Sequence, residues 1–216
     1  MKTRFPWLRI LVHLLGLLPL VRIGLAALTG GLSINPIQDI EQRLGRAALY
    51  FLVATLAVTP LTTLTGWKSL PRRRRALGLY ASLYASLHFF TFSVVDYGFD
   101  LPEILRLIGE KPYILVGFTT GLLLLPLAVT SFDYFMCTMG RRWKRLHRLI
   151  YPAGLLVILH YAWAVKGNLL TLRGDILQPL LWGLLVVLLL VLRLPAVRAR
   201  VSRSRQALAA RVSRSA

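Results

Sequence analysis

Residues 146–163 read LHRLIYPAGLLVILHYAW, a stretch in which Leu, Ile, Val, Tyr and Ala surround two histidines, His147 and His160. The apolar run at 148–165 is close to the roughly 20 residues that an α-helix needs to cross a bilayer core about 30 Å thick. An ionisable side chain inside such a run is costly and therefore indicates a function. The stretch predicts a membrane-spanning helix that carries a functional histidine.

Five further apolar runs lie along the chain, which has 216 residues, 56% of them hydrophobic and only 16% charged. This composition is outside the range of soluble domains and predicts an all-α membrane protein. Residues 1–195 are expected to form a bundle of six transmembrane helices. The expected spans are approximately 8–28, 47–65, 76–95, 112–131, 148–165 and 176–194.

The net charge of +19 first suggests a nucleic-acid binder, but the positions of the charges argue against that. In a six-span reading, twenty of the 27 Lys and Arg residues lie on the side that holds both termini. Seven of the eight acidic residues lie on the opposite side. The positive-inside rule therefore places both termini in the cytoplasm, and residues 196–216 are predicted to be a basic flexible tail on anionic lipid.

The sequence argues against a cleaved signal peptide, a disulfide and a nucleotide-binding module. Residues 1–28 could be taken for a signal peptide, but their long apolar run includes Pro19 and Arg22, which favours an uncleaved first helix. The only cysteine, Cys137, falls in an inner loop, so no internal disulfide is expected. No GxGxxG or GxxxxGK[ST] motif is present, which argues against a built-in nucleotide-binding module.

His88 and His160 have matched depths in the predicted membrane. Each lies 12 residues from the inner start of an outward-running span, hence about 18 Å from the inner face. Two histidines on different helices at one depth can take both axial positions of a haem iron, a coordination suited to electron transfer. The alternative is a hydrogen bond between helices.

His147 lies thirteen residues before His160, hence about 20 Å away along the helix axis, so the two cannot bind one iron. They could bind two stacked haems, one near each leaflet. His13 is the only other histidine and could complete the inner site, or it could bond a neighbouring helix. His147 could equally belong to the wet basic loop at 141–148.

The surroundings of the histidines are compatible with a porphyrin. Several aromatic residues could form its walls: Phe89, Phe90, Phe92, Tyr84, Tyr161 and Trp163. Arg46, Lys166 and Arg173 could bind propionates on the outer side. The sequence GFTTG at 117–121 suggests a close helix contact, and no internal repeat is evident.

Six segments of the chain are characteristic when taken together. They are HLLGLLPL at 13–20, NPIQDIEQRLGRAAL at 35–49, FLVATLAVTPL at 51–61, LHFFTF at 87–92, KPYILVG at 111–117 and RRWKRLHRLIYPAGLLVILHYAWAVK at 141–166. In these segments the chain resembles the MsrQ family, formerly YedZ, which is the haem-binding membrane subunit of the MsrPQ methionine-sulfoxide reductase system. The family belongs to the ferric-reductase-like transmembrane group.

The resemblance implies a multi-pass cytochrome of the bacterial inner membrane with one or two haems b, whose ligand positions match His88, His147 and His160. It implies electron transfer from quinol to the periplasmic molybdopterin enzyme MsrP, which reduces methionine sulfoxide in oxidised proteins. Sulfoxide reduction would then occur on the partner chain. The family also implies FMN, for which no residue of this chain is assigned.

Two alternatives remain at this stage. One is the membrane subunit of a ferric-chelate or other metal reductase, which would need a separate NAD(P)H and flavin module. The other is a transporter or structural membrane protein without a redox centre, in which the histidines serve packing or proton relay. That last class predicts a colourless protein.

Overall fold

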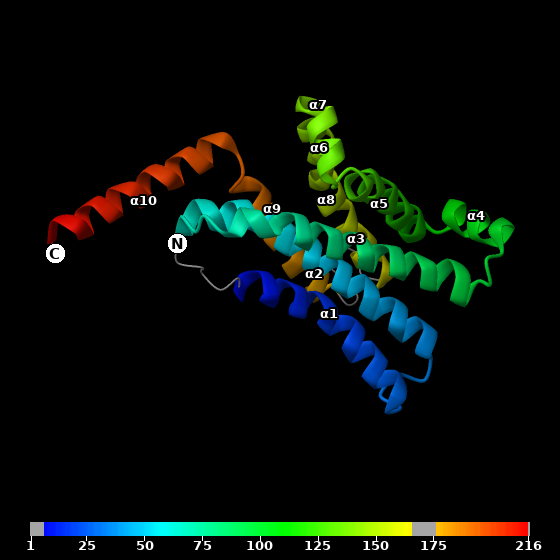
Figure 1. The fold of residues 1–216 in the computed structure, drawn as a ribbon. Helices are drawn as coiled ribbons and strands as arrows, with labels where there is room; N and C mark the ends of the chain where they lie inside the picture. The colour runs from blue at the N-terminus through cyan, green and yellow to red at the C-terminus, as the bar shows by residue number, and fades with distance from the viewer. Residues whose placement is uncertain (1–6, 166–175, 216) are drawn as a thin grey trace.

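The computed structural model describes residues 7–165 and 176–215, and side chains as far as residue 206. Every regular element in these ranges is a helix (Figure 1). The all-α prediction is therefore confirmed for the described part of the chain. What positions the histidines is the pairing of these helices.

The first part of the bundle consists of α1 (Trp7–Leu28), α2 (Pro36–Thr65) and α3 (Arg74–Phe90). The 30-residue helix α2 runs antiparallel to α3 at the centre of the fold (Figure 1). A short 3-10 turn, η1 (Leu70–Arg73), precedes α3. One turn of π-helix, η2 (Thr91–Asp96), follows α3 and begins three residues after His88. Such turns often mark functional sites.

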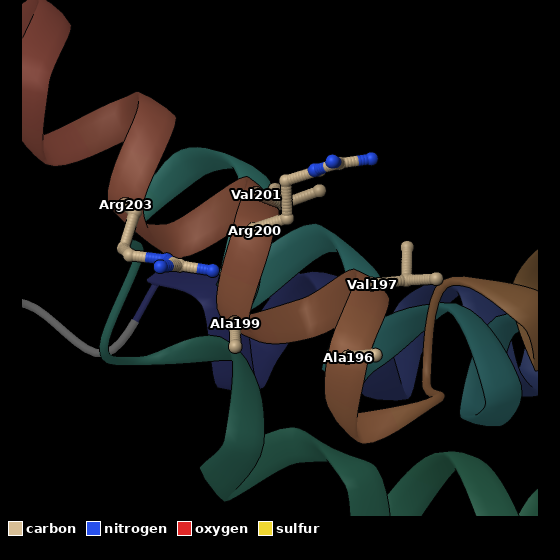
Figure 2. A pocket seen from close by; sticks show the side chains of 6 residues that line it. All are labelled: Ala196, Val197, Ala199, Arg200, Val201 and Arg203. Atoms are coloured by element: carbon tan, nitrogen blue, oxygen red, sulfur yellow. The ribbon is translucent and has the colours of Figure 1, made fainter.

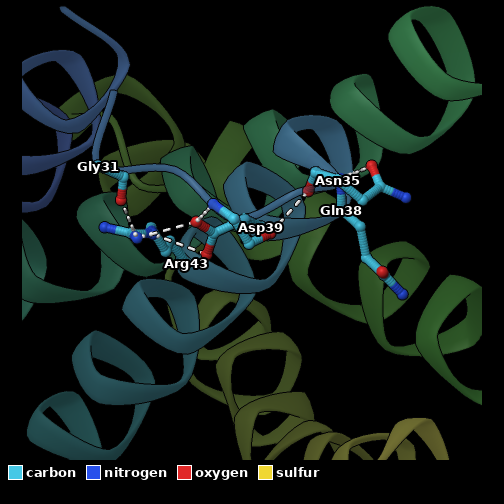
Figure 3. Close-up of polar contacts among 6 residues, drawn as sticks. Gly31, Asn35, Gln38, Asp39 and Arg43 are labelled. Carbon is cyan, nitrogen blue, oxygen red and sulfur yellow. Dashed lines mark hydrogen bonds and ion pairs between the residues drawn. The ribbon is translucent and has the colours of Figure 1, made fainter. Parts of the chain in front are cut away.

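The start of α2 is fixed by polar contacts (Figure 3). Asn35 is the N-cap, because its side-chain oxygen accepts from the backbone N–H of Gln38 at 3.2 Å. Arg43 donates two bonds of 2.8 Å to Asp39 and one of 3.3 Å to the carbonyl of Gly31. The helix therefore begins about three turns before the apolar run predicted at 47–65.

The second part begins with the amphipathic helix α4 (Leu101–Glu110), followed by α5 (Pro112–Val129). Two short helices, α6 (Asp133–Met139) and α7 (Arg141–Leu146), lead through the 3-10 turn η3 (His147–Leu149) into α8 (Ile150–Ala164). Helices α5 and α8 pack against each other, as α2 and α3 do.

The chain ends with α9 (Leu177–Val191) and α10 (Pro195–Ser215), which meet at a bend of 79°. The segment that the sequence predicts to be a flexible tail, 196–216, is thus helical as far as Ser215. Arg205 holds α10 on the bundle by donating to the carbonyls of Thr62 and Thr63 near the end of α2. An open hollow runs along α10, and Arg200 and Arg203 extend to different sides of it (Figure 2). Its lining residues are Ala196, Val197, Ala199, Arg200, Val201 and Arg203.

Each of the six predicted spans falls on a helix, but two of these helices are short. Helices α8 and α9 have 15 residues each, fewer than the roughly 20 that cross a bilayer upright. Among the described residues, four helices are long and apolar enough to cross a membrane, or five if the bent pair α9 and α10 is one span. The chain is therefore a multi-pass helical membrane protein, and the count of six stays a prediction.

The core lies between α2, α3, α5, α8 and α9, with Leu56, Tyr84 and Val186 almost completely buried. Large apolar side chains also cover the outside of the bundle, such as Leu14, Leu125 and Leu184, which are 58–64% exposed. In water this exposure would be unfavourable, whereas lipid tails solvate such side chains.

Candidate functional site

His88 of α3 and His160 of α8 face each other between the two helix pairs. Their ring centres are 6.1 Å apart, and the ring planes cross at 75°. The two residues are 72 positions apart in the sequence, and the fold brings them together. The predicted pairing of these two side chains is thus the arrangement that the structure has.

Each imidazole is held by a backbone carbonyl of the helix beside it. Nδ1 of His88 lies 2.9 Å from the carbonyl oxygen of Glu41 in α2. Nδ1 of His160 lies 2.7 Å from the carbonyl oxygen of Tyr113 in α5. A carbonyl only accepts, so each Nδ1 carries the proton and donates it, which leaves a lone pair on each Nε2 in the neutral ring.

Two glycines bring the rings close to these helices. A Cβ atom added at Gly45 would lie 3.2 Å from Nδ1 of His88, and one added at Gly117 would lie 2.6 Å from Nδ1 of His160. Both glycines come four residues after the carbonyl that accepts the bond, hence on the same helix face one turn later. The Nδ1–Cε1 edge of each ring lies so close to the helix that a side chain at either glycine would crowd it.

The distance between the two ring centres is the one expected if His88 and His160 were to hold one haem iron between them. Two imidazoles bound through Nε2 on opposite sides of a metal have ring centres about 6 Å apart, because a metal–imidazole bond is about 2 Å long. Nδ1 bonded to a carbonyl is the usual way in which a metal-binding histidine is oriented. The His88 side chain is 26% exposed, and the Glu41 carboxylate lies 4.0 Å from its Nε2.

His147 occupies a separate place at the inner end of α8. Its ring stacks on Trp143 with centres 4.0 Å apart, and its Nε2 lies 3.2 Å from Oγ1 of Thr130. The Thr130 hydroxyl donates to the carbonyl of Pro126, so it accepts from Nε2–H of His147. Burial, and then the nearby charge of Arg74, lower the pKa of His147, so its neutral form is favoured.

His13 is engaged elsewhere. Its Nδ1 lies 3.0 Å from the Tyr80 hydroxyl, and the two rings meet edge to face at 5.9 Å. Among the described residues, no hydrogen bond or ring contact joins His13 to His147. The structure thus brings one pair of histidines together, and it does not bring these other two into contact.

The aromatic residues named as porphyrin walls have different surroundings. Tyr84 is fully buried in the core, where it stacks on Phe51 and donates to the carbonyl of Gly16, so it does not line the histidine site. Phe89 and Phe90 are 43% and 52% exposed beside His88. Of the cations proposed for propionates, Arg46 lies in α2, whereas Lys166 and Arg173 fall outside the described residues.

The groups that orient the imidazoles were not predicted from the sequence. The hydrogen bonds of His88 and His160 both span 47 residues, and each glycine follows its carbonyl by four. The unit Glu41, Gly45, His88 therefore recurs as Tyr113, Gly117, His160. This shared spacing is a short internal repeat, and a search for equal intervals around the two histidines would have found it.

Comparison with known proteins gives the family. The family described as "Ferric reductase like transmembrane component" matches residues 44–158, a range that includes His88 and His147 and ends just before His160. No solved structure matches the chain.

Curated relatives are similar over most of the chain, and each carries the name protein-methionine-sulfoxide reductase heme-binding subunit MsrQ. The protein of Herminiimonas arsenicoxydans is 44% identical over 85% of this chain and 82% of its own length. That of Bordetella pertussis is 42% identical over 86% of this chain and 88% of its own. That of Xanthomonas euvesicatoria pv. vesicatoria is 45% identical over 83% and 82%.

Proposed function

Because this chain belongs to the MsrQ family of ferric-reductase-like transmembrane proteins, we propose that it is the haem-binding, electron-transferring membrane subunit of a methionine-sulfoxide reductase system. The observation that carries the proposal is the pair His88 and His160, with ring centres 6.1 Å apart and both Nδ1 atoms bonded to carbonyls. The pair supplies two neutral nitrogen ligands on two different helices.

The proposed role of His88 and His160 is to hold one haem b through their Nε2 atoms. When bound, a haem with two imidazole ligands transfers single electrons and has no open position for oxygen. The carbonyls of Glu41 and Tyr113 keep each ring in one tautomer and one orientation. Helices α2 and α5 thereby act as the rigid support of the site.

The proposed electron donor is a quinol, and the proposed acceptor is MsrP, a periplasmic molybdopterin enzyme. Reduction of one methionine sulfoxide to methionine and water consumes two electrons and two protons. One quinol releases the same number of each when it is oxidised to the quinone. The chain would pass the two electrons one after the other, and the sulfoxide would be reduced on the partner.

The proposed topology has six spans, both termini in the cytoplasm and a place in the bacterial inner membrane. The basic clusters at the inner ends of the helices support it, because Lys and Arg accumulate on the cytoplasmic side. Residues 1–195 would form the membrane domain and 196–216 a basic cytoplasmic segment on anionic lipid. FMN enters only from the family resemblance, and no residue is proposed for it.

For His147 we propose a second haem near the inner face. The support is its neutral, partly buried ring about 20 Å from His160 along the helix axis. His13 would have to leave Tyr80 to become the other ligand. Two haems per purified chain, falling to one in His147→Ala, is the expected result. One haem in both proteins would contradict this second site.

The decisive experiment is a reduced-minus-oxidised visible spectrum of the detergent-purified protein, with haem type and content measured as the pyridine complex. We expect a low-spin b-type spectrum that loses the contribution of this haem in His88→Ala and in His160→Ala. Tyr80→Phe is the matched control, because its hydroxyl bonds His13 outside this pair. Full haem content in either ligand variant, or a colourless parent, would overturn the proposal.

A membrane subunit of a metal reductase is the second candidate, since the matching family is described as ferric-reductase-like. Both candidates predict a haem spectrum, so the electron donor has to separate them. Haem reduction by a quinol analogue in purified protein, without NAD(P)H or any added flavoprotein, is expected here. Reduction only after a flavin reductase is added would favour the metal reductase.

A further inference from the structure

Gly45 and Gly117 lie against the same two atoms of the two imidazoles. An added Cβ at Gly117 would come within 2.6 Å of Nδ1 and 2.7 Å of Cε1 of His160. At Gly45 the corresponding distances to His88 are 3.2 and 3.3 Å. The crowded atoms are therefore those next to the hydrogen bond that orients each ring.

We propose that Gly45 and Gly117 are positioning residues for the haem ligands, an inference that rests on the proposed function. The absence of a side chain lets each imidazole lie on the helix backbone and donate to the carbonyl one turn earlier. A methyl group at either position would push the ring away from Glu41 or Tyr113. The Nδ1–H bond would then weaken, and Nε2 would turn away from the iron.

The arrangement of the two helix pairs supports a role for both glycines in making room for the imidazole rings. A glycine inside a helix is less favourable than alanine, so its presence needs a local reason. The same reason occurs twice, in two helix pairs, with equal spacing of carbonyl, glycine and histidine. Two independent instances of one contact make a chance coincidence a poor explanation.

Gly121 shows that the contact is specific to one glycine of the GFTTG segment. It lies one turn after Gly117 on α5. Apart from its two chain neighbours and the adjacent backbone of its own helix, no described atom would lie within 4 Å of a Cβ added there. The segment was predicted to make a close helix contact. Gly117 makes such a contact, with the imidazole of His160 on α8, whereas Gly121 adjoins open space and is therefore the matched control.

The hydrogen bond to Nδ1 also has an electronic effect. A donor bond from the far nitrogen raises the basicity of a metal-binding imidazole, and a more basic ligand favours the oxidised iron. Weakening the bond should therefore raise the midpoint potential of the haem. Loss of packing alone would not give this sign, so the potential separates positioning from general stability.

The test compares the parent protein with Gly117→Ala, Gly45→Ala and Gly121→Ala. For each we would measure the midpoint potential, the low-spin electron paramagnetic resonance spectrum and the rate of haem transfer to excess apomyoglobin. In Gly117→Ala the transfer rate should rise about 10- to 100-fold, with a higher midpoint potential and altered low-spin g values. Gly45→Ala should change in the same direction by less, and Gly121→Ala should match the parent.

An unchanged potential, spectrum and transfer rate in both Gly117→Ala and Gly45→Ala would overturn the inference while leaving the haem function intact. Equal effects in Gly121→Ala would overturn it too, because helix packing would then be the cause. If Gly117→Ala does not fold, Gly45→Ala decides, since its ring needs to move by only a few tenths of an ångström. A parent without haem would instead refute the proposed function.

Discussion

At the scale of single residues, the four histidines of the chain fall into three different surroundings. His88 and His160 share one site, and the Nδ1 atom of each makes an equivalent hydrogen bond to a backbone carbonyl. His147 stacks on Trp143 at the inner end of α8, and His13 bonds Tyr80. All four are the same residue type, so it is the hydrogen-bond partner of each ring nitrogen that distinguishes a candidate ligand from a histidine with a structural role.

The pair His13 and Tyr80 gives a prediction at this scale. Tyr80→Phe removes the hydroxyl that lies 3.0 Å from Nδ1 of His13 and should lower the free energy of unfolding by about 1 kcal/mol. His13→Ala should cost a similar amount, and the double variant should cost clearly less than the sum of the two. Thermal unfolding in detergent measures all three.

Haem content gives the complementary readout for that pair. If His13 only joins α1 to α3, all three variants keep the haem content of the parent. A haem loss in His13→Ala that Tyr80→Phe does not share would show instead that His13 binds a haem.

At the scale of elements, the centre of α2 depends on a side chain from the other end of the sequence. Pro60 lies inside α2 and has no N–H, so the carbonyl of Leu56 loses its partner within the helix. Arg193 replaces it, with Nη2 at 2.7 Å and Nε at 3.1 Å from that oxygen. Its guanidinium also lies 5.5 Å from the centre of the Tyr151 ring.

Arg193→Met is therefore expected to destabilise the bundle by about 1–3 kcal/mol, because a buried carbonyl is left without a donor. The exposed Arg198 on α10 is the matched control, since Arg198→Met removes the same charge without removing a described side-chain contact. The midpoint of thermal unfolding in detergent distinguishes the two variants. Equal midpoints would mean that the Leu56 carbonyl is satisfied in another way.

At the scale of the whole molecule, the direction of the bundle in the membrane decides which side of the membrane the histidine pair is nearer. The histidine pair bonds to carbonyls in the first turns of α5 and the second turn of α2, so the site lies near one end of both helices. The basic clusters lie at the other end. In the proposed topology, which rests on the positive-inside rule, the site lies toward the periplasm.

The single cysteine makes this orientation testable. Cys137 is exposed on α6, at the end opposite the histidine pair, and should react with a membrane-impermeant maleimide only in inside-out vesicles. Cys137→Ser provides the unlabelled control. In that background, Leu105→Cys on the exposed face of α4 should react only in right-side-out vesicles. Labelling of Cys137 from the periplasmic side would reverse the proposed topology.

The sequence by itself determined the class of the protein and the pairing of His88 with His160. Apolar runs predict membrane helices because the bilayer fixes their length, and counting along a helix at 1.5 Å per residue gives depth. The two histidines therefore came out at one level without knowledge of the packing. The start of α2 was missed, because the polar segment 35–46 has no apolar run, and local capping rather than hydrophobicity places the helix end there.

The tertiary structure alone decided what surrounds each imidazole. Which carbonyl accepts from His88, and which glycine leaves room for His160, depend on the helix that packs beside each ring. The same holds for the helical segment after Pro195, which Arg205 joins to the end of α2, and for Arg193 on the carbonyl freed by Pro60. Such contacts join residues up to 143 positions apart. Periodicity and hydropathy describe only neighbours along the chain, so they do not contain this information.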